Sequence, residues 1–299
     1  MVPKGKMHSD EVRVAETLAA RLVAAQFPQW VQLPLAALHA GGSDNTLIRL
    51  GSSLVLRFPR HVKAAAQVDV ESTCLPILAP HLPLAVPAIA AVGKPDFGYP
   101  YPWLVLSWLP GETAQTAPPV DELATARGLA GFVQALHARP VPPEMPRMAM
   151  ERHLRPRDNF TRQMIARLTD EVAPALATRR WEEALLLPEW NGAPVLVHAD
   201  LHPLNLLTAN GAVSAVIDWG GLCAGDPAHD MICAWMVLDH PGRALFRDLM
   251  QVDGATWARA RALAFSKALM AAPYHRKTNP ALHRVMRGAL KRSLADWPA

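Results

Sequence analysis

A short segment of this sequence carries acidic and amide side chains at a spacing that suits phosphoryl transfer. Asp200 lies five residues before Asn205, and Asp218 follows after a predicted hairpin. Phosphoryl transfer needs a carboxylate to orient the attacking hydroxyl and accept its proton, and hard oxygen ligands to hold Mg²⁺ against the phosphates. Asp200 is therefore the candidate base, and Asn205 and Asp218 are the candidate Mg²⁺ ligands.

Short β-rich runs are predicted to position these side chains. They cover residues 194–197, 206–208 and 213–217. Asn210-Gly211 lies between the last two runs and is a strong signal for a tight hairpin turn. Such a hairpin is a rigid way to bring positions 205 and 218 together.

The rest of the chain divides into a β-containing first part and a mainly helical second part. A helix capped by Ser9 and ending near Pro28 is expected first. A hairpin around Gly51 should follow. The further elements expected are strands at 46–50, 54–58 and 101–109, helices at 63–78, 121–138, 158–178, 254–270 and 281–297, and a proline-rich loop at 140–146.

The catalytic segment resembles a known family. HADLHPLN (198–205) is similar to the catalytic loop of protein kinases, and DWG (218–220) stands where kinases have DFG. With GDPAHD at 225–230, the chain more specifically resembles the aminoglycoside-phosphotransferase family. GGSDNTLIRL, LVLRFPR, VLSWLPGE and PYHRKTNP extend this likeness over most of the chain. The resemblance implies a bilobal, protein-kinase-like α+β fold with an N-terminal nucleotide-binding lobe at 1–106, a hinge at 107–112 and a C-terminal catalytic lobe at 113–299.

The same resemblance implies supporting roles around the catalytic loop. His198 and Gly220 are expected to be architectural, and Asp226 and Asp230 to hold backbone amides of the loop. His202 occupies the position of the catalytic-loop lysine of protein kinases. It could reach the transferred phosphoryl group or pack beneath the loop, and both alternatives stay open.

A second set of residues is expected to bind the nucleotide. Arg57 stands where kinases place a phosphate-binding lysine, with Glu71 as its candidate partner. The alternative is that Arg57 is a surface arginine of a strand. The backbone of Ser107 and Leu109 is expected to pair with a purine edge, and Ser43 belongs to the hairpin that covers the nucleotide.

The spacing after DWG indicates the kind of acceptor. Five residues separate Gly220 from Asp226, and no A-P-E signal follows. Protein kinases place a long activation segment there. Without a platform for a peptide, the acceptor is predicted to be a small hydroxylated molecule.

Composition excludes several other classes. The 30 basic and 26 acidic residues give a net charge of +4, spread over many segments, so no nucleic-acid partner is expected. Three cysteines without a CxxC pair fit a reducing cytoplasm. The longest apolar stretch, 82–92, contains two prolines and is too short for a bilayer. No secretory signal is visible, and a soluble cytoplasmic protein is predicted.

The sequence thus predicts a Mg²⁺-dependent kinase that uses ATP or GTP, with an aminoglycoside-type antibiotic as the first candidate acceptor. A macrolide or metabolite kinase of the same fold is the alternative. A nucleotide-binding pseudokinase is the alternative from another class, although Asp200, Asn205 and Asp218 are all present. The carboxylates expected to bind a polycationic acceptor are Glu151, Asp158 and Asp239.

Overall fold

The computed structural model describes residues 11–38 and 44–297, with the backbone alone for residues 271–278 and 281. Ser9 and Ser43 lie outside the described residues. The chain divides into two compact units. The first contains the chain up to Pro80, Ala85–Pro110 and Asp218–Gly220, and the second contains His81–Leu84, Gly111–Ile217 and the chain from Gly221 onward. The lobe bounds 1–106, 107–112 and 113–299 remain a prediction.

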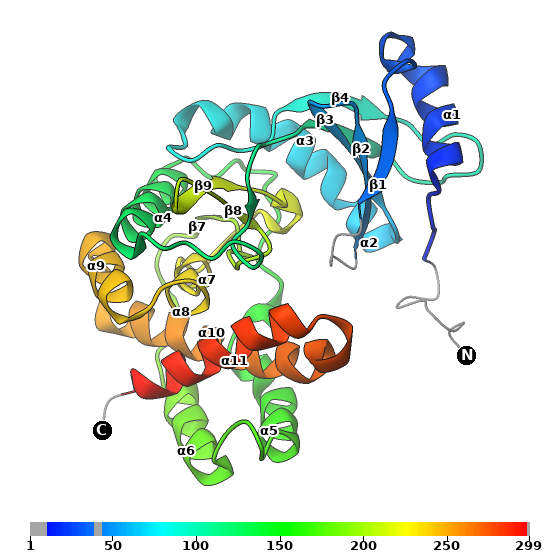
Figure 1. Cartoon of the computed structure of the whole chain (residues 1–299). Helices are drawn as coiled ribbons and strands as arrows, with labels where there is room; N and C mark the ends of the chain where they lie inside the picture. The colour runs from blue at the N-terminus through cyan, green and yellow to red at the C-terminus, as the bar shows by residue number, and fades with distance from the viewer. Residues whose placement is uncertain (1–10, 39–43, 298–299) are drawn as a thin grey trace. The chain divides into compact units, whose positions relative to one another are not determined.

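The first unit is built on a five-stranded antiparallel sheet (Figure 1). In spatial order its strands are β1 (Leu35–Leu38), β2 (Asn45–Leu50), β3 (Leu54–Pro59), β5 (Trp103–Ser107) and β4 (Ile89–Gly93). The predicted hairpin is confirmed, because β2 and β3 pair from Leu50↔Leu54 to Asn45↔Pro59. Gly51 starts the turn with φ +60°, a conformation that glycine adopts without steric cost.

Helices cover both faces of this sheet. Leu22 of α1 (Glu16–Gln26) packs in one core cluster with Leu56 and Phe58 of β3. Val68 of α3 (Gln67–Leu78) packs with Val55 of β3 in another. Alternation along β3 therefore places Arg57 on the same face as Val55, toward α3. A short helix, α2 (Val62–Ala65), precedes α3.

The second unit is mainly helical and contains two small sheets. Its helices are α4 (Glu122–His137), α5 (Asp158–Arg167), α6 (Pro174–Leu185), α7 (Ala228–Met231), α8 (Cys233–Met236), α9 (His240–Met250), α10 (Gly254–Thr278) and α11 (Pro280–Ala295). β6 (Glu112–Thr113), β8 (Leu206–Ala209) and β9 (Ala212–Val216) form one sheet, and β10 (Cys223–Gly225) pairs with β7 (Val195–Val197) in the other. The predicted α+β organisation, with a β-containing first part and a mainly helical second part, is confirmed.

Three predicted helices differ from the structure. The helix expected at 63–78 is the pair α2 and α3. The helix expected at 158–178 is two helices, α5 and α6, which lie side by side in Figure 1. Pro174 explains this, because proline fits the first turn of a helix but not its interior. The first helix begins only at Glu16, since the Val12 N–H donates to the Arg60 carbonyl at 2.7 Å in an extended segment.

Among the described helices, none combines the length and the apolarity that crossing a lipid bilayer requires. Among the described residues the three cysteines form no disulfide, and Cys223 and Cys233 are buried. Burial raises the pKa of the Cys223 thiol to about 11, so this thiol stays protonated at neutral pH.

The β8–β9 hairpin gives the first testable prediction. Asn210 and Gly211 have φ +53° and +81°, and a Cβ added at Gly211 would lie 2.9 Å from Val120 Cγ2. Gly211→Ala should therefore lower the free energy of unfolding by about 1–2 kcal/mol. Gly254→Ala is the matched control, because a Cβ there has no neighbour within 4 Å. Chemical denaturation of both variants measures the difference, and equal stabilities would contradict the assigned turn.

Candidate functional site

The loop between β7 and β8 is held by the buried carboxylate of Asp230. Its Oδ2 accepts from the His198 N–H at 3.0 Å, and its Oδ1 accepts from the Ala199 N–H at 2.7 Å. His137 of α4 contacts Oδ2 through Nε2, also at 3.0 Å. Asp230 is fully buried, so these partners offset the cost of its desolvation. Its position matches the expected role as a support for the loop backbone.

Asp226 has different partners from those expected. Its carboxylate accepts from the Ala228 N–H at 2.9 Å and from Nε and Nη2 of Arg259 at 2.8 and 3.2 Å. These bonds fix the turn into α7 and attach it to α10, rather than holding backbone amides of the catalytic loop. The sequence motif GDPAHD could not separate the two tasks, because both need an aspartate in a tight turn.

His198 connects the catalytic loop to the strand that leads to Asp218. Its ring is buried, and Nε2 lies 3.2 Å from the Ile217 carbonyl, so it donates there. The Ile217 N–H in turn donates to the Asn205 carbonyl at 2.9 Å. Asp218 follows Ile217 directly in the chain. This contact accords with an architectural role for His198, which stays a prediction.

Asp200 is bound at both of its carboxylate oxygens. Oδ2 accepts from Asn205 Nδ2 at 2.9 Å and lies 3.3 Å from His202 Nε2. Oδ1 forms an ion pair with Lys267 Nζ. Burial alone would raise the pKa of Asp200, but the charge of Lys267 and the contact with His202 outweigh it and hold the pKa well below its ordinary value. The carboxylate is therefore ionised at neutral pH.

The structure favours one of the two alternatives for His202. The Leu204 N–H donates to His202 Nδ1 at 3.3 Å, so the proton of the ring lies on Nε2 and faces Asp200. His202 thus contacts residues of its own loop. Whether it also reaches the transferred phosphoryl group stays a prediction.

Lys267 was not predicted from the sequence. It comes from α10, 67 residues after Asp200, and its neighbours in the sequence are apolar or small. Its position is a consequence of how α10 packs in the unit.

Asn205 and Asp218 each keep an oxygen suited to a divalent cation. Asn205 Nδ2 faces Asp200, so the amide Oδ1 points to the other side. The Asp218 side chain is 46% exposed, and only its Oδ1 is bound by Arg57, at 2.8 Å. Because carboxylate and amide oxygens are preferred Mg²⁺ ligands, each of these two side chains is chemically suited to the metal that the sequence implies. Their joint role as ligands stays a prediction.

Arg57 lies at the centre of a polar cluster in the first unit. Its Nη1 pairs with Glu71 of α3, and its Nη2 with Asp218. With its amide oxygen facing the guanidinium, Asn45 accepts from Nε and Nη2 at 3.1 and 3.0 Å. The side chains of Arg57 and Glu71 are 7% and 1% exposed, so Arg57 is not a surface arginine.

Position 220 must be a glycine because side chains of the first unit lie against its backbone. A Cβ at this position would lie 2.4 Å from Gln67 Oε1 and 2.9 Å from Arg57 Nη2. Any larger residue would therefore displace the guanidinium or the glutamine.

Strand β5 ends at Ser107, whose backbone is expected to pair with a purine edge. The Ser107 N–H donates to the Ala88 carbonyl at 2.9 Å, and the Trp108 N–H to Ser53 at 2.7 Å. Ser107 can therefore offer only its carbonyl to a base. The contribution of Leu109 stays a prediction, and Ser43 lies outside the described residues.

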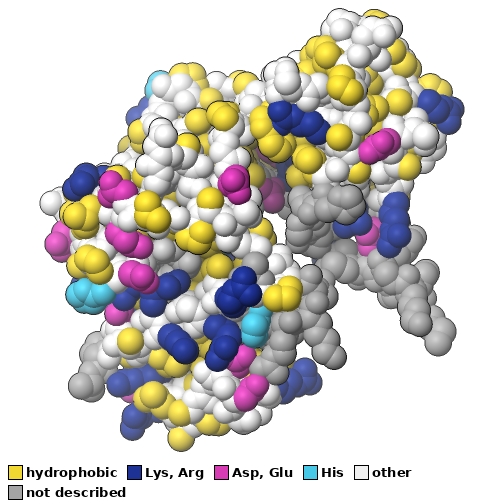
Figure 2. Space-filling model, viewed as in Figure 1, with side chains coloured by type: hydrophobic (Ala, Val, Ile, Leu, Met, Phe, Trp, Pro, Cys, Tyr) yellow, Lys and Arg dark blue, Asp and Glu magenta, His cyan; other side chains and the backbone are white. Residues whose placement is uncertain are grey.

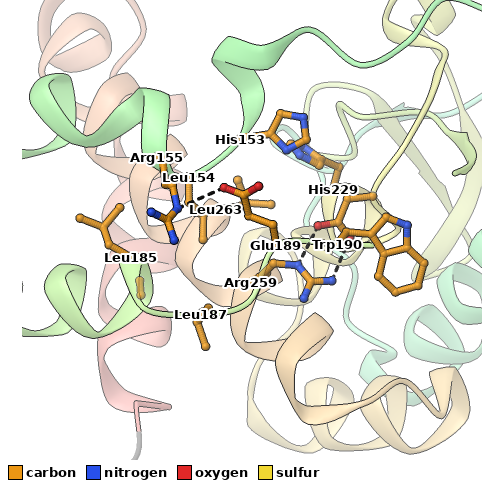
Figure 3. A pocket seen from close by; sticks show the side chains of 12 residues that line it. His153, Leu154, Arg155, Leu185, Leu187, Glu189, Trp190, His229, Arg259 and Leu263 are labelled. Carbon is orange, nitrogen blue, oxygen red and sulfur yellow. Dashed lines mark hydrogen bonds and ion pairs between the residues drawn. The ribbon is translucent and has the colours of Figure 1, made fainter. Parts of the chain in front are cut away.

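A pocket in the second unit is too small for an acceptor. It lies between His153, Leu154, Glu189, Trp190 and Leu263, and Figure 3 shows the ion pair Arg155–Glu189 along its wall. Arg259, which also lines the pocket, pairs with Asp226. Its free volume of about 20 Å³ accommodates roughly one water molecule. This pocket is therefore part of the packing around the GDPAHD turn.

The geometry agrees with comparisons to known proteins. The profile of the phosphotransferase enzyme family matches residues 35–263, which is more than half of the chain. The chain belongs to this phosphotransferase enzyme family. No curated protein sequence matches the chain.

Solved structures show the same fold. The GDP complex of aminoglycoside 2′-phosphotransferase-IIIa has a TM-score of 0.69 at 19% identity and covers 95% of this chain and 99% of that one. A GDP and kanamycin complex of an APH(2″)-IIIa enzyme gives 0.68 at 19%, covering 93% and 98%. A macrolide 2′-phosphotransferase from Brachybacterium faecium gives 0.62 at 24%, covering 94% and 99%. At these identities the likeness shows the fold of this phosphotransferase.

The buried pair Arg57–Glu71 gives a prediction about nucleotide affinity. Arg57→Gln and Glu71→Gln should each weaken nucleotide binding. Arg57→Gln leaves the buried carboxylate of Glu71 without its counterion, and Glu71→Gln leaves the guanidinium of Arg57 with Asp218 as its remaining carboxylate partner. The double variant should lose less than the sum of the two single losses. Isothermal titration of the phosphotransferase with ATP and GTP measures this coupling.

Arg60→Gln is the matched control, since Arg60 pairs with Glu11 and its side chain is more exposed, at 24%. It should leave the affinity within about twofold of wild type. Strictly additive losses for Arg57 and Glu71 would place the pair outside the phosphate site.

Proposed function

We propose that this phosphotransferase moves the γ-phosphoryl group of ATP or GTP to a hydroxyl of a small molecule. The observation that carries the proposal is the arrangement at Asp200, where Asn205 holds one carboxylate oxygen and turns its own amide oxygen outward. A pseudokinase would not need an ionised carboxylate with both oxygens fixed. This arrangement supports an enzyme over a binding protein.

Asp200 is proposed to orient the acceptor hydroxyl and to take its proton as the oxygen attacks phosphorus. Since the transition state is loose, positioning contributes more than base strength. A carboxylate with a lowered pKa is well suited to that task. Asn205 and Asp218 would hold Mg²⁺, which neutralises phosphate charge when it is bound.

Arg57 is proposed to bind the phosphates of the nucleotide. Its forked guanidinium can serve two partners at once, and Glu71 fixes its orientation. The nucleotide-bound neighbours, which carry GDP, support a nucleoside triphosphate as the donor. A cytoplasmic location accords with three free cysteines and remains part of the proposal.

An aminoglycoside-type antibiotic is the first candidate acceptor, because structural neighbours include aminoglycoside phosphotransferases. Two of the three carboxylates predicted to meet a polycation are already bound. Asp158 accepts from Arg162 at 2.7 Å and from Trp181 Nε1 at 2.8 Å, and Asp239 pairs with Arg292 at 3.2 Å. Glu151 is exposed and has no ion pair among the described residues.

A macrolide is the second candidate. Macrolide 2′-phosphotransferases are also among the structural neighbours. On the face of the larger unit shown in Figure 2, acidic and basic side chains are interspersed and form no continuous acidic surface. A neutral or apolar acceptor would not depend on such a surface.

A screen of nucleotide consumption tests the proposed function. Purified protein with Mg²⁺ and ATP or GTP should consume nucleotide with at least one aminoglycoside, macrolide or hydroxylated metabolite. Asp200→Asn should lower turnover by about 10²–10⁴-fold while nucleotide affinity is kept. An acceptor-dependent turnover that survives this substitution would remove Asp200 from the role of base.

The salt dependence of acceptor binding separates the two candidates. An aminoglycoside held by several exposed carboxylates should bind much more weakly at about 0.5 M than at 0.05 M salt, because screening weakens each pair. A macrolide should bind almost equally at both. Calorimetry with one compound of each kind decides between them.

The metal ligands give a separate prediction. Asp218→Ala should abolish the part of nucleotide affinity that depends on Mg²⁺, because the proposed carboxylate ligand is removed. Titrations with and without Mg²⁺ measure this part. Asp69→Ala, an exposed aspartate of α3, is the control and should behave as wild type. An unchanged effect of Mg²⁺ in the Asp218 variant would exclude Asp218 as a ligand.

A further inference from the structure

Lys267 has hydrogen-bonding capacity that its contact with Asp200 does not use. Its ammonium pairs with Asp200 Oδ1, while Oδ2 is shared by Asn205 and His202. An ammonium carries three N–H donors. In the part of the chain that the structure describes, the ammonium of Lys267 donates to Asp200, so donors remain for a bound anion.

Lys267 is not needed to hold α10 in place. The side chains of Lys267 and Asp200 are 26% and 36% exposed, and an ion pair with this exposure contributes little to folding stability. Other residues of α10 attach the helix more firmly. Arg259 binds Asp226 at 2.8 Å, and Ser266 binds Thr161 of α5 at 3.0 Å in a fully buried contact. These contacts fix the position of α10, and with it the position of the Lys267 backbone.

The surroundings of Lys267 favour an anion. Burial and the charges of Arg157, Arg152, His153 and Lys267 hold the pKa of His229 well below its ordinary value. The ring centroids of His153 and His229 lie 6.3 Å apart. Burial and Arg152 lower the pKa of Arg157 to about 10. Among the described residues neither Arg152 nor Arg157 forms an ion pair with a carboxylate. Arg152 and Arg157 therefore add positive charge whose counterion is not a carboxylate of the described residues.

The chemistry of the proposed reaction supplies the anion at this place. The acceptor oxygen loses its proton to Asp200 and forms a bond to the γ-phosphorus. The bond from that phosphorus to the bridging oxygen breaks, and its electron pair leaves with the nucleoside diphosphate. Negative charge on the transferred phosphoryl oxygens is stabilised by cations placed beforehand. The acceptor oxygen that attacks the γ-phosphorus is bound to Asp200, and the ammonium of Lys267 is bound to the same carboxylate. The ammonium is therefore within reach of the phosphoryl oxygens.

We propose that Lys267 is a catalytic residue that donates to the phosphoryl group in transit while it also holds Asp200. The inference rests on the proposed function, since it assigns Lys267 a role in phosphoryl transfer. A residue of α10, in addition to those of the catalytic loop, would then stabilise the negative charge of the transition state.

Substitution of Lys267 tests the proposal. Lys267→Met should lower kcat by about 10²–10³-fold, as removal of one positioned donor does in other enzymes, with nucleotide affinity and melting temperature unchanged. Lys267→Arg should restore part of kcat because it keeps the charge. Lys291→Met, an exposed lysine of α11, is the matched control and should be as active as wild type. If Lys267→Met does not fold, Lys267→Gln replaces it.

A double substitution separates direct contact from positioning. If Lys267 only orients Asp200, Lys267→Met should cost nothing further in an Asp200→Asn background. A further loss of at least about tenfold is expected if the ammonium also contacts the phosphoryl group. The absence of this further loss, a kcat of Lys267→Met within twofold of wild type, or a rise in kcat would each overturn the proposal.

The test does not depend on finding the acceptor. Where wild type phosphorylates a compound of the panel, kcat is measured with that compound. Where it phosphorylates none, the proposed acceptor class fails, and the same variants are compared by the rate of nucleotide hydrolysis with water as the acceptor. A failure of the proposed acceptor class is thereby distinguished from a failure of the proposed role of Lys267.

Discussion

The carboxylate of Asp230 accepts hydrogen bonds from two consecutive backbone amides of the catalytic loop and contacts a histidine of α4. A fully buried carboxylate is costly unless such partners are present, so α4, α7 and the loop must stay together. The loop adopts an unusual backbone at Ala199, where φ is +64°. The two bonds to Asp230 hold that turn, and the direction of Asp200 and Asn205 depends on it.

At Asp200, too, hydrogen-bond donors surround a carboxylate, but here they prepare it for contact with a substrate. Three donors from the loop and from α10 surround a carboxylate that is partly exposed, and they keep it ionised. Such a group orients a hydroxyl better than it removes a proton. That balance suits phosphoryl transfer, in which charge stabilisation and alignment dominate over strong base catalysis.

In the first unit the buried charge is a cation, the guanidinium of Arg57, which also needs partners to offset its desolvation. Alternation along β3 directs Arg57 toward α3, where Glu71 lies on the buried stripe of the helix with Val68 and Leu75. The guanidinium binds Glu71 through one nitrogen and Asp218 through another. A lysine is a single point of charge and lacks this fork, so the arginine can hold both carboxylates in fixed directions.

The sequence by itself determined the family, the β2–β3 and β8–β9 hairpins, and the carboxylate and amide residues of the loop, because motif spacing and turn residues are local properties. It could not show that 158–178 is two helices, since the effect of Pro174 depends on where each helix begins. It also assigned Asp226 to the wrong partners. Lys267 belongs to no local motif, and only the packing of α10 in the tertiary structure places its ammonium on Asp200, because a contact across 67 residues is decided by the fold.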